Sequence, residues 1–241
     1  MEGALKLLFP HRDGSALQAM IVNSAGGITG GDRFTIEAHA EAGAALTLTT
    51  QACERAYRAQ PGEVGELKVR LVAEAGGRLE WLPQETILFQ CSALRRHLRV
   101  DLAADAQLLL CEPIILGRAA MGEAVTQAFF ADRVEIFRDG RELFIDATRL
   151  SGDLAAQMDN PAVGRGARAM ALVAYVAPNA EAERDRIRAM WADDPLAGVS
   201  LIAPDTLVAR VLASDGFALR QRLLPVLDRL TGNTLPRSWR L

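Results

Sequence analysis

A glycine-rich segment, NSAGGITGGD at residues 23–32, holds the first residues whose types and spacing could do chemistry. Gly26 and Gly31 have the spacing of the glycines in a phosphate-binding loop, but Asp32 and Arg33 stand where that loop needs its lysine and its hydroxyl. A dinucleotide-binding loop is excluded as well, because its second glycine is missing and a strand, not a helix, is expected to follow. We therefore expect a tight loop that places Asp32 at its end, with a plain turn capped by an aspartate as the alternative.

Carboxylates and amides also follow the predicted strands. In EWLPQETILF, residues 80–89, a proline breaks backbone pairing and presents Gln84 and Glu85 at the end of a strand. Alignment of the repeats described below pairs Gln51 with Gln84 and places Glu112 one position earlier. We expect these four side chains at one end of the sheets, with solvated strand ends as the alternative. Their oxygens suit transient binding of a divalent ion better than a permanent tetrahedral metal site.

A hydrolase is the alternative class of protein, with Glu85 and Glu112 as acid and base. The chain lacks the sequence motifs of serine hydrolases and zinc proteases, and its three histidines are far apart in sequence. Cys53, Cys91 and Cys111 are odd in number and widely spaced, which argues against a disulfide framework or a structural zinc site. The residues alone therefore give no positive sign of an active site.

Composition indicates an ordinary globular chain. Its 241 residues, 50% hydrophobic and 24% charged, can form one core, so we expect a single domain over residues 1–241. A net charge of -3, with arginines scattered among acids, argues against nucleic-acid binding. Because no apolar run is long enough to span a membrane and the first residues lack the features of a signal peptide, we expect a cytoplasmic protein.

Residues 34–146 alternate between apolar and polar side chains, which predicts β-strands. Three segments in this region share one layout of strand, small and acidic turn, and second strand; they are 36–51, 69–84 and 98–113. Gly43 and Gly76 fall at the same place in the first two turns, where a positive φ is needed. We interpret the segments as β-hairpins stacked into an elongated, helical architecture of two sheets.

The last part of the chain changes character. Asp139-Gly140 between two alternating strands predicts a hairpin with a type I′ turn, which completes a hairpin stack over residues 1–150. In residues 151–241 we expect a helix capped by Asn179, two strands at 199–203 and 206–213, and a helix from 217 to 230 capped by Ser214 or Asp215. The expected fold is thus mainly β, with two α-helices in the C-terminal part.

Taken together, the motifs resemble those of the urease accessory protein UreD (UreH) family. The resemblance covers nearly the whole chain, through NSAGGITGGD, TTQACERAYRA, LEWLPQETILF, CEPIILGRAAMGE, VEIFRDGRELF and the ending LPRSW. It implies a mainly β fold and a non-enzymatic scaffold that binds the urease apoprotein and, with UreF and the GTPase UreG, supports the delivery of nickel to urease.

The resemblance also implies an internal route along which Ni²⁺ passes without a tightly bound cofactor. The acidic positions that it carries over to this chain are Asp32, Glu112 and Asp146, as groups that line the route. Widely spaced single carboxylates would suit such a route, because a cargo ion must be both held and released.

Two features depart from the family pattern. Relatives usually carry a further strand region before the segment that matches GALKLLFP, so the resemblance implies a shortened N-terminus or a misassigned start, with an unpaired edge strand. Cys53, Glu54 and Arg55 stand where relatives more often have small polar residues and lysine.

Overall fold

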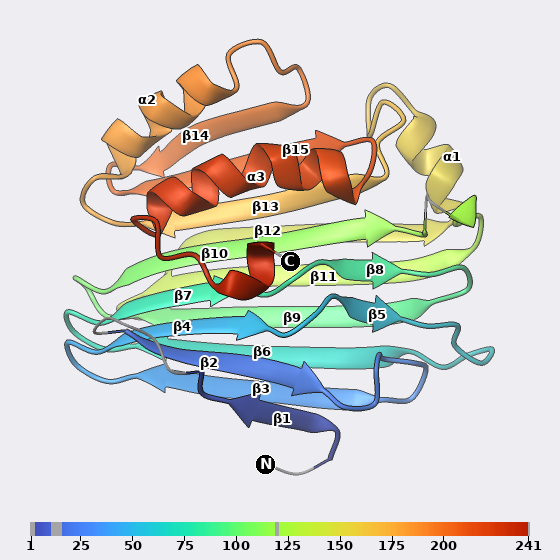
Figure 1. The fold of residues 1–241 in the computed structure, drawn as a ribbon, viewed down its shortest axis with the longest axis horizontal. Coiled ribbons are helices and arrows are strands. Elements are labelled where there is room, and N and C mark those ends of the chain that lie inside the picture. The colour runs from blue at the N-terminus through green and yellow to red at the C-terminus, as the bar shows by residue number, and fades with distance from the viewer. Residues whose placement is uncertain (1–2, 11–15, 119–120, 241) are drawn as a thin grey trace.

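The structure, a computed structural model, describes residues 3–10, 16–118 and 121–240 as two stacked β-sheets with two of the helices, α2 (Ala180–Met190) and α3 (Gly216–Leu230), packed on the larger sheet (Figure 1). Within these ranges the larger sheet contains β1 (Leu5–Leu8), β2 (Leu17–Asn23), β4 (Ala45–Thr50), β5 (Glu54–Ala56), β7 (Arg78–Leu82), β8 (Thr86–Leu88), β10 (Gln107–Leu116), β13 (Ala169–Val176), β14 (Ala197–Ala203) and β15 (Thr206–Ala213). The smaller sheet contains β3 (Arg33–Ala40), β6 (Gly65–Ala73), β9 (Ala93–Leu102), β11 (Ala128–Arg138) and β12 (Arg141–Gly152). Besides α2 and α3 there are α1 (Leu154–Asp159) and the 3-10 helix η2 (Arg237–Arg240). This mainly β, two-sheet architecture is the one expected from the sequence.

The three repeated segments are arches, not hairpins. The first strand of each segment lies in the smaller sheet and the second in the larger sheet, so the two strands do not pair with each other. Instead, equivalent strands pair in parallel from one segment to the next: β3 with β6 and β9, and β4 with β7 and β10. The predicted pairing within each segment was wrong, because alternation and turn residues look the same whether the chain returns to its own sheet or crosses about 10 Å to the next one.

Hydrogen bonds between successive turns hold the arches in register. Gly43 and Gly76 have φ values of 68° and 66°, as predicted for these positions. The amide of Gly43 donates to the Ala75 carbonyl at 2.9 Å, and the amide of Gly76 donates to Asp105 Oδ1 at 2.9 Å. The third turn has Asp105 in place of the glycine, and it is the Asp105 side chain that accepts the hydrogen bond from the Gly76 amide of the second turn.

The predicted Asp-Gly hairpin is confirmed. Strands β11 and β12 pair antiparallel, with Arg138 opposite Arg141. The two turn residues, Asp139 and Gly140, both have positive φ values, 48° and 72°, as a type I′ turn requires. Because β11 also pairs in parallel with β9, this hairpin ends the smaller sheet.

The C-terminal part contains both predicted helices and both predicted strands, together with α1 and β13, which were not predicted. Strand β13 pairs with β10 and β15, so the larger sheet continues across residue 150 and extends past the smaller one. Its sequence, AMALVAYV, does not alternate, because the strand is buried on both faces. Asp215 caps α3 by accepting a hydrogen bond from the Ala218 amide at 2.8 Å, whereas the Asn179 side chain makes no such bond to α2.

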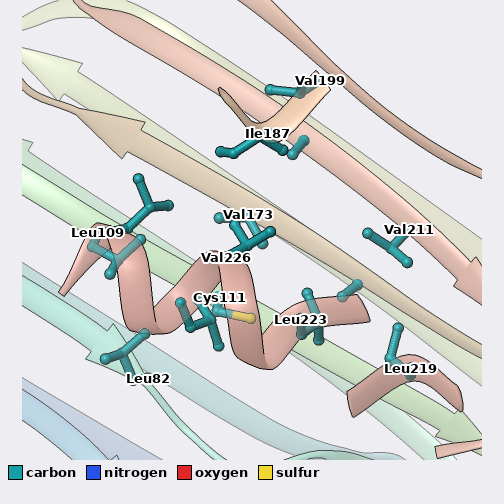
Figure 2. Close-up of a cluster of buried hydrophobic side chains, with 14 of the residues drawn as sticks. Leu82, Leu109, Cys111, Val173, Ile187, Val199, Val211, Leu219, Leu223 and Val226 are labelled. Atoms are coloured by element: carbon teal, nitrogen blue, oxygen red, sulfur yellow. The ribbon is translucent and has the colours of Figure 1, made fainter. Parts of the chain in front are cut away.

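Two apolar layers form the core. One lies between the sheets, and the other lies between the larger sheet and helices α2 and α3 (Figure 2). In the second layer Leu219, Leu223 and Val226 of α3 pack with Cys111 of β10, which is a free, fully buried cysteine. No helix in the described part of the chain is both long and apolar enough to cross a membrane.

A proline break in the larger sheet is where the C-terminus is attached. Pro83 separates β7 from β8, and at this break the Leu82 carbonyl accepts hydrogen bonds from Thr49 Oγ1 at 2.7 Å and from Trp239 Nε1 at 3.0 Å. Arg220 of α3 lies over the Trp239 ring and donates to the Trp239 carbonyl at 3.1 Å. The ending LPRSW therefore joins α3 to the sheet.

The same arginine holds a buried carboxylate at this break. Arg220 Nε lies 2.6 Å from Glu85 Oε1, and its Nη2 lies 2.8 Å from Oε2, while Glu85 is 1% exposed. Burial raises the pKa of Glu85, but the hydrogen bonds and charge of Arg220 outweigh burial, so the pKa is lowered from 4.5.

We predict that Trp239→Ala lowers the free energy of unfolding by about 3–5 kcal/mol, because it empties a fully buried ring site and leaves the Leu82 carbonyl one donor short. Urea unfolding followed by circular dichroism measures this. Trp239→Phe, which keeps most of the ring and loses the donor, should lie between the parent and Trp239→Ala. Equal stability of Trp239→Ala and the parent would contradict the attachment.

We predict that Arg220→Met destabilises the fold in a pH-dependent way. A carboxylate with a lowered folded-state pKa stabilises the fold above its ordinary pKa, and this contribution is lost as the pH falls through the lowered value. Without Arg220, burial raises the pKa of Glu85, so the variant should lose on the order of 3 kcal/mol at pH 7. The loss should shrink as the pH falls through the raised pKa of the variant toward the lowered one of the parent.

Urea unfolding at a series of pH values between 7 and 4 checks this prediction. Arg240→Met is the matched control, because Arg240 pairs with Asp228 in a more exposed position, where such pairs contribute little. A difference between Arg220→Met and the parent that stays constant with pH would show that the arginine acts only through packing.

Candidate functional site

Three adjacent cavities contain most of the candidate residues. The β12 cavity, of about 510 Å³, lies where the larger sheet extends past β12; its polar lining includes Glu112, Asp132, Asp146, Thr148 and Arg210. The middle cavity, of about 40 Å³, lies between the sheets and is lined by Glu54, Trp81, Thr86, Arg96, Glu112 and Asp132, among others. The loop cavity, of about 310 Å³, is lined by residues 21–23, Gly26 and 50–55. Glu112 and Asp132 belong to the first two cavities, and Glu54 belongs to the last two, so a carboxylate stands at each shared wall.

Charged residues at inward-facing positions form the wall between the β12 cavity and the middle cavity. Glu112 of β10, Arg96 of β9 and Asp132 of β11 each interrupt a stripe of apolar residues that faces the space between the sheets. Apolar clusters lie on both sides of this level, one around Leu98 and the other around Leu94. The three residues therefore form a charged layer within an apolar interior.

Glu112 is buried, with 6% of its surface exposed. Trp81 Nε1 donates to Glu112 Oε1 at 2.5 Å, and Arg96 Nη1 lies 2.8 Å from Glu112 Oε2. Burial raises the pKa of Glu112 and the charge of Arg96 lowers it, while Asp132 raises it further; the net shift is upward. This carboxylate is thus held in place but incompletely neutralised.

Arg96 and Asp132 form the second half of the charged layer. The two residues are register partners on β9 and β11, and Arg96 binds Asp132 through two bonds, from Nε at 3.2 Å and from Nη2 at 2.6 Å. Burial lowers the pKa of Arg96, but Asp132 and Glu112 raise it more, so the guanidinium stays charged. Neither residue was predicted, although a charged residue inside an apolar stripe of a strand is a signal that the sequence contains.

Asp146 shares the β12 cavity with Glu112. It lies on β12 with 16% of its side chain exposed, and it pairs with Arg210 of β15, whose side chain is 57% exposed. The structure thus brings two of the three predicted route residues, Glu112 and Asp146, to one cavity.

Asp32 lies apart from these two residues and lines none of the three cavities. Its Oδ2 accepts a hydrogen bond from the Thr29 amide at 2.8 Å and so closes the glycine-rich loop. Gly27 has no room for a side chain, because an added Cβ would lie 2.3 Å from the Tyr57 ring. Both interpretations of this loop describe part of it: it is tight, and its aspartate caps its own backbone.

Glu54 connects the loop to the cavities and was not among the predicted site residues. Asn23 Nδ2, from the glycine-rich segment, donates to both Glu54 oxygens at 3.2 and 3.0 Å. Burial raises the pKa of Glu54, the Asn23 bonds lower it, and the nearby charge of Asp32 adds to the net increase. Asp32 therefore lies near this cavity wall without lining any of the three cavities.

The predicted polar cluster lies in the middle of the larger sheet, not at its end, because β5, β8 and the second half of β10 continue past the proline break. Gln84, Glu85 and Glu112 are buried, so the solvated alternative is wrong for them, whereas Gln51 is exposed. Glu85 binds Arg220 of α3, while Glu112 faces the smaller sheet. The two carboxylates of the hydrolase hypothesis thus contact different layers of the molecule.

In the described part of the chain, no three side chains of His, Cys, Asp or Glu come together in a way that could hold a metal ion. The β12 cavity instead offers three separate carboxylates, each of which pairs with an arginine. Such an arrangement can bind a divalent ion through one or two oxygens, with water as the remaining ligands.

Comparison with known proteins assigns the family. The sequence model described as UreD urease accessory protein matches residues 1–240. A urease accessory protein UreD from Roseobacter denitrificans is 53% identical over 240 residues, which is 99% of this chain and 86% of the relative. Proteins with the same name from Ruegeria pomeroyi and Sinorhizobium medicae are 52% and 44% identical and cover 98% and 100% of this chain, and 91% and 88% of their own lengths. The chain therefore belongs to the UreD family of urease accessory proteins.

Proposed function

We propose that this chain binds the urease apoprotein as a non-enzymatic scaffold and, with UreF and UreG, assists the insertion of nickel into urease in the cytoplasm. The observation that carries the proposal is the row of three adjacent cavities with a carboxylate at each shared wall. In this proposal Ni²⁺ is cargo that passes along the row and is not a resident cofactor.

The chemistry of the walls supports a cargo ion. Glu112, Asp132 and Asp146 present carboxylate oxygens, which bind divalent ions but do not enclose them as a set of cysteines and histidines would. The middle cavity is far smaller than its two neighbours, so an ion that enters it must exchange water for wall oxygens. Glu54, Glu112 and Asp132 stand at that point.

Asp32 has a different place in this proposal. It closes the glycine-rich loop and its charge lies near Glu54, so in this proposal it supports one wall without touching the ion. The direct groups are then Glu112 and Asp146, together with Asp132 and Glu54.

The non-enzymatic role is supported by how the carboxylates are used. Glu85 is bound by both arms of Arg220, and Glu112 is bound by Trp81 and Arg96, so neither is free as an acid or base. Turnover of a substrate by the isolated chain, lost on Glu112→Gln, would instead favour the hydrolase alternative.

We predict that Glu112→Gln combined with Asp146→Asn slows urease activation at least about tenfold at limiting nickel, because the variant loses two of the carboxylate charges that attract the ion in the β12 cavity. The chain is co-expressed with urease, UreF and UreG, and the assay follows urease activity against time after nickel addition. Affinity capture of the complex should be unchanged, since both side chains line a cavity.

Glu142→Gln is the matched control, because Glu142 is an exposed carboxylate on β12, the strand of Asp146. A double variant that assembles normally and activates urease at the parent rate with limiting nickel would refute the route. Loss of the complex would instead assign the residues to assembly.

A further inference from the structure

Arg96 stands at the wall between the β12 cavity and the middle cavity. It lines the middle cavity and bridges Glu112 and Asp132, which belong to both. With 6% of its surface exposed, its guanidinium is a fixed positive charge in the interior. Any cation that moves between these two cavities meets it.

The bridge is unequal on its two sides. Asp132 receives two hydrogen bonds from Nε and Nη2, in the forked geometry that suits a guanidinium and a carboxylate. Glu112 is approached only by Nη1, which also donates to Thr86 Oγ1 at 3.0 Å. The contact with Glu112 can therefore be broken while the fork on Asp132 remains.

One oxygen of Glu112 is held by an ion pair alone. Oε2 lies 2.8 Å from Arg96 Nη1, yet among the described residues no donor meets it in hydrogen-bond geometry. A buried carboxylate oxygen without a hydrogen bond is unfavourable, and in native structures it calls for an explanation.

The charge of the layer is also incomplete. One guanidinium faces two carboxylates, so the layer carries a formal charge of about -1 when both are ionised, in an interior where an uncompensated charge is costly. A second cation next to Glu112 Oε2 would remove that excess.

We propose that Arg96 is an internal counter-cation that closes the wall between the two cavities, and that a divalent ion crosses by replacing Arg96 Nη1 at Glu112 while the guanidinium stays on Asp132. This proposal rests on the nickel route proposed above and names the residue that regulates it. The ring of Phe130, 5.3 Å from the guanidinium carbon, and Thr86 support the arginine when Glu112 is released.

The test measures nickel binding by the full chain, with Ni²⁺ alone as the probe. Arg96→Gln removes the positive charge and keeps an amide that can donate to Asp132. We expect equilibrium dialysis to show one Ni²⁺ bound at least about tenfold more tightly than by the parent, as expected when a fixed charge leaves a cation site. Nickel should also raise the melting temperature of this variant more than that of the parent, because a bound ligand stabilises the folded state.

Two further variants identify the site. Arg96→Gln with Glu112→Gln should lose the added nickel, because the open carboxylate is gone. Arg99→Gln is the matched control: Arg99 lies on the same strand and pairs with Asp101 on the exposed face, so its loss should leave nickel binding as in the parent. A folded Arg96→Gln variant that binds no more nickel than the parent overturns the proposal.

A variant that keeps the arginine covers the case in which Arg96→Gln does not fold. In Asp132→Asn the guanidinium faces Glu112 as its one remaining charge partner in the layer, so nickel-limited urease activation should be slower although the complex forms. Activation at the parent rate overturns the proposal.

The outcomes separate this proposal from the route itself. If Glu112→Gln slows activation but Arg96→Gln gains no nickel, the route stands and the role of Arg96 is wrong. If Arg96→Gln gains nickel but Glu112→Gln activates urease normally, the exchange at Glu112 is supported and the proposed route fails.

Discussion

Parallel pairing in constant register is the constraint on which the rest of the structure depends. Each arch sends one strand to the smaller sheet and one to the larger sheet, and each new strand pairs with its equivalent in the arch before it. Every second residue of each strand therefore faces the space between the sheets, at a level fixed by its place in the repeat. Apolar residues fill nearly all of these positions, and the few charged ones meet other charged ones at the same level. The layer of Glu112, Arg96 and Asp132 follows directly from this geometry.

Much of this geometry could be predicted from the sequence, and the part that could not has a definite cause. The repeats, the positive φ of Gly43 and Gly76, the Asp-Gly turn and the two longer C-terminal helices depend on local residue patterns, and they are present in the structure. The contact of Arg96 with Asp132 depends on β9 and β11 being neighbours, which happens because β10 crosses to the other sheet between them. A hairpin would have kept β10 beside β9, and local patterns do not distinguish the two.

The candidate site shows the same division. Glu112 and Asp146 were predicted from a family resemblance, and the structure brings both to one cavity. Asp32 came from the same resemblance but closes a loop, because its carboxylate accepts a hydrogen bond from the Thr29 amide three residues earlier. Residues that meet only through the stacking of the sheets, such as Asp132, were missed, although an ionisable residue within an apolar stripe marks each of them.

The two buried arginine sites differ in how completely the arginine neutralises its carboxylates. Arg220 and Glu85 match one charge with one charge, both carboxylate oxygens are bound, and the pKa of Glu85 is lowered. Arg96 faces two carboxylates, one oxygen of Glu112 lacks a hydrogen bond, and the pKa of Glu112 is raised. A balanced pair holds one conformation, because any exchange of partners would leave a buried charge unpaired. In the unbalanced layer Glu112 Oε2 has only its ion pair with Arg96, so in our proposal a second cation takes the place of that contact, as passage of an ion between two cavities requires.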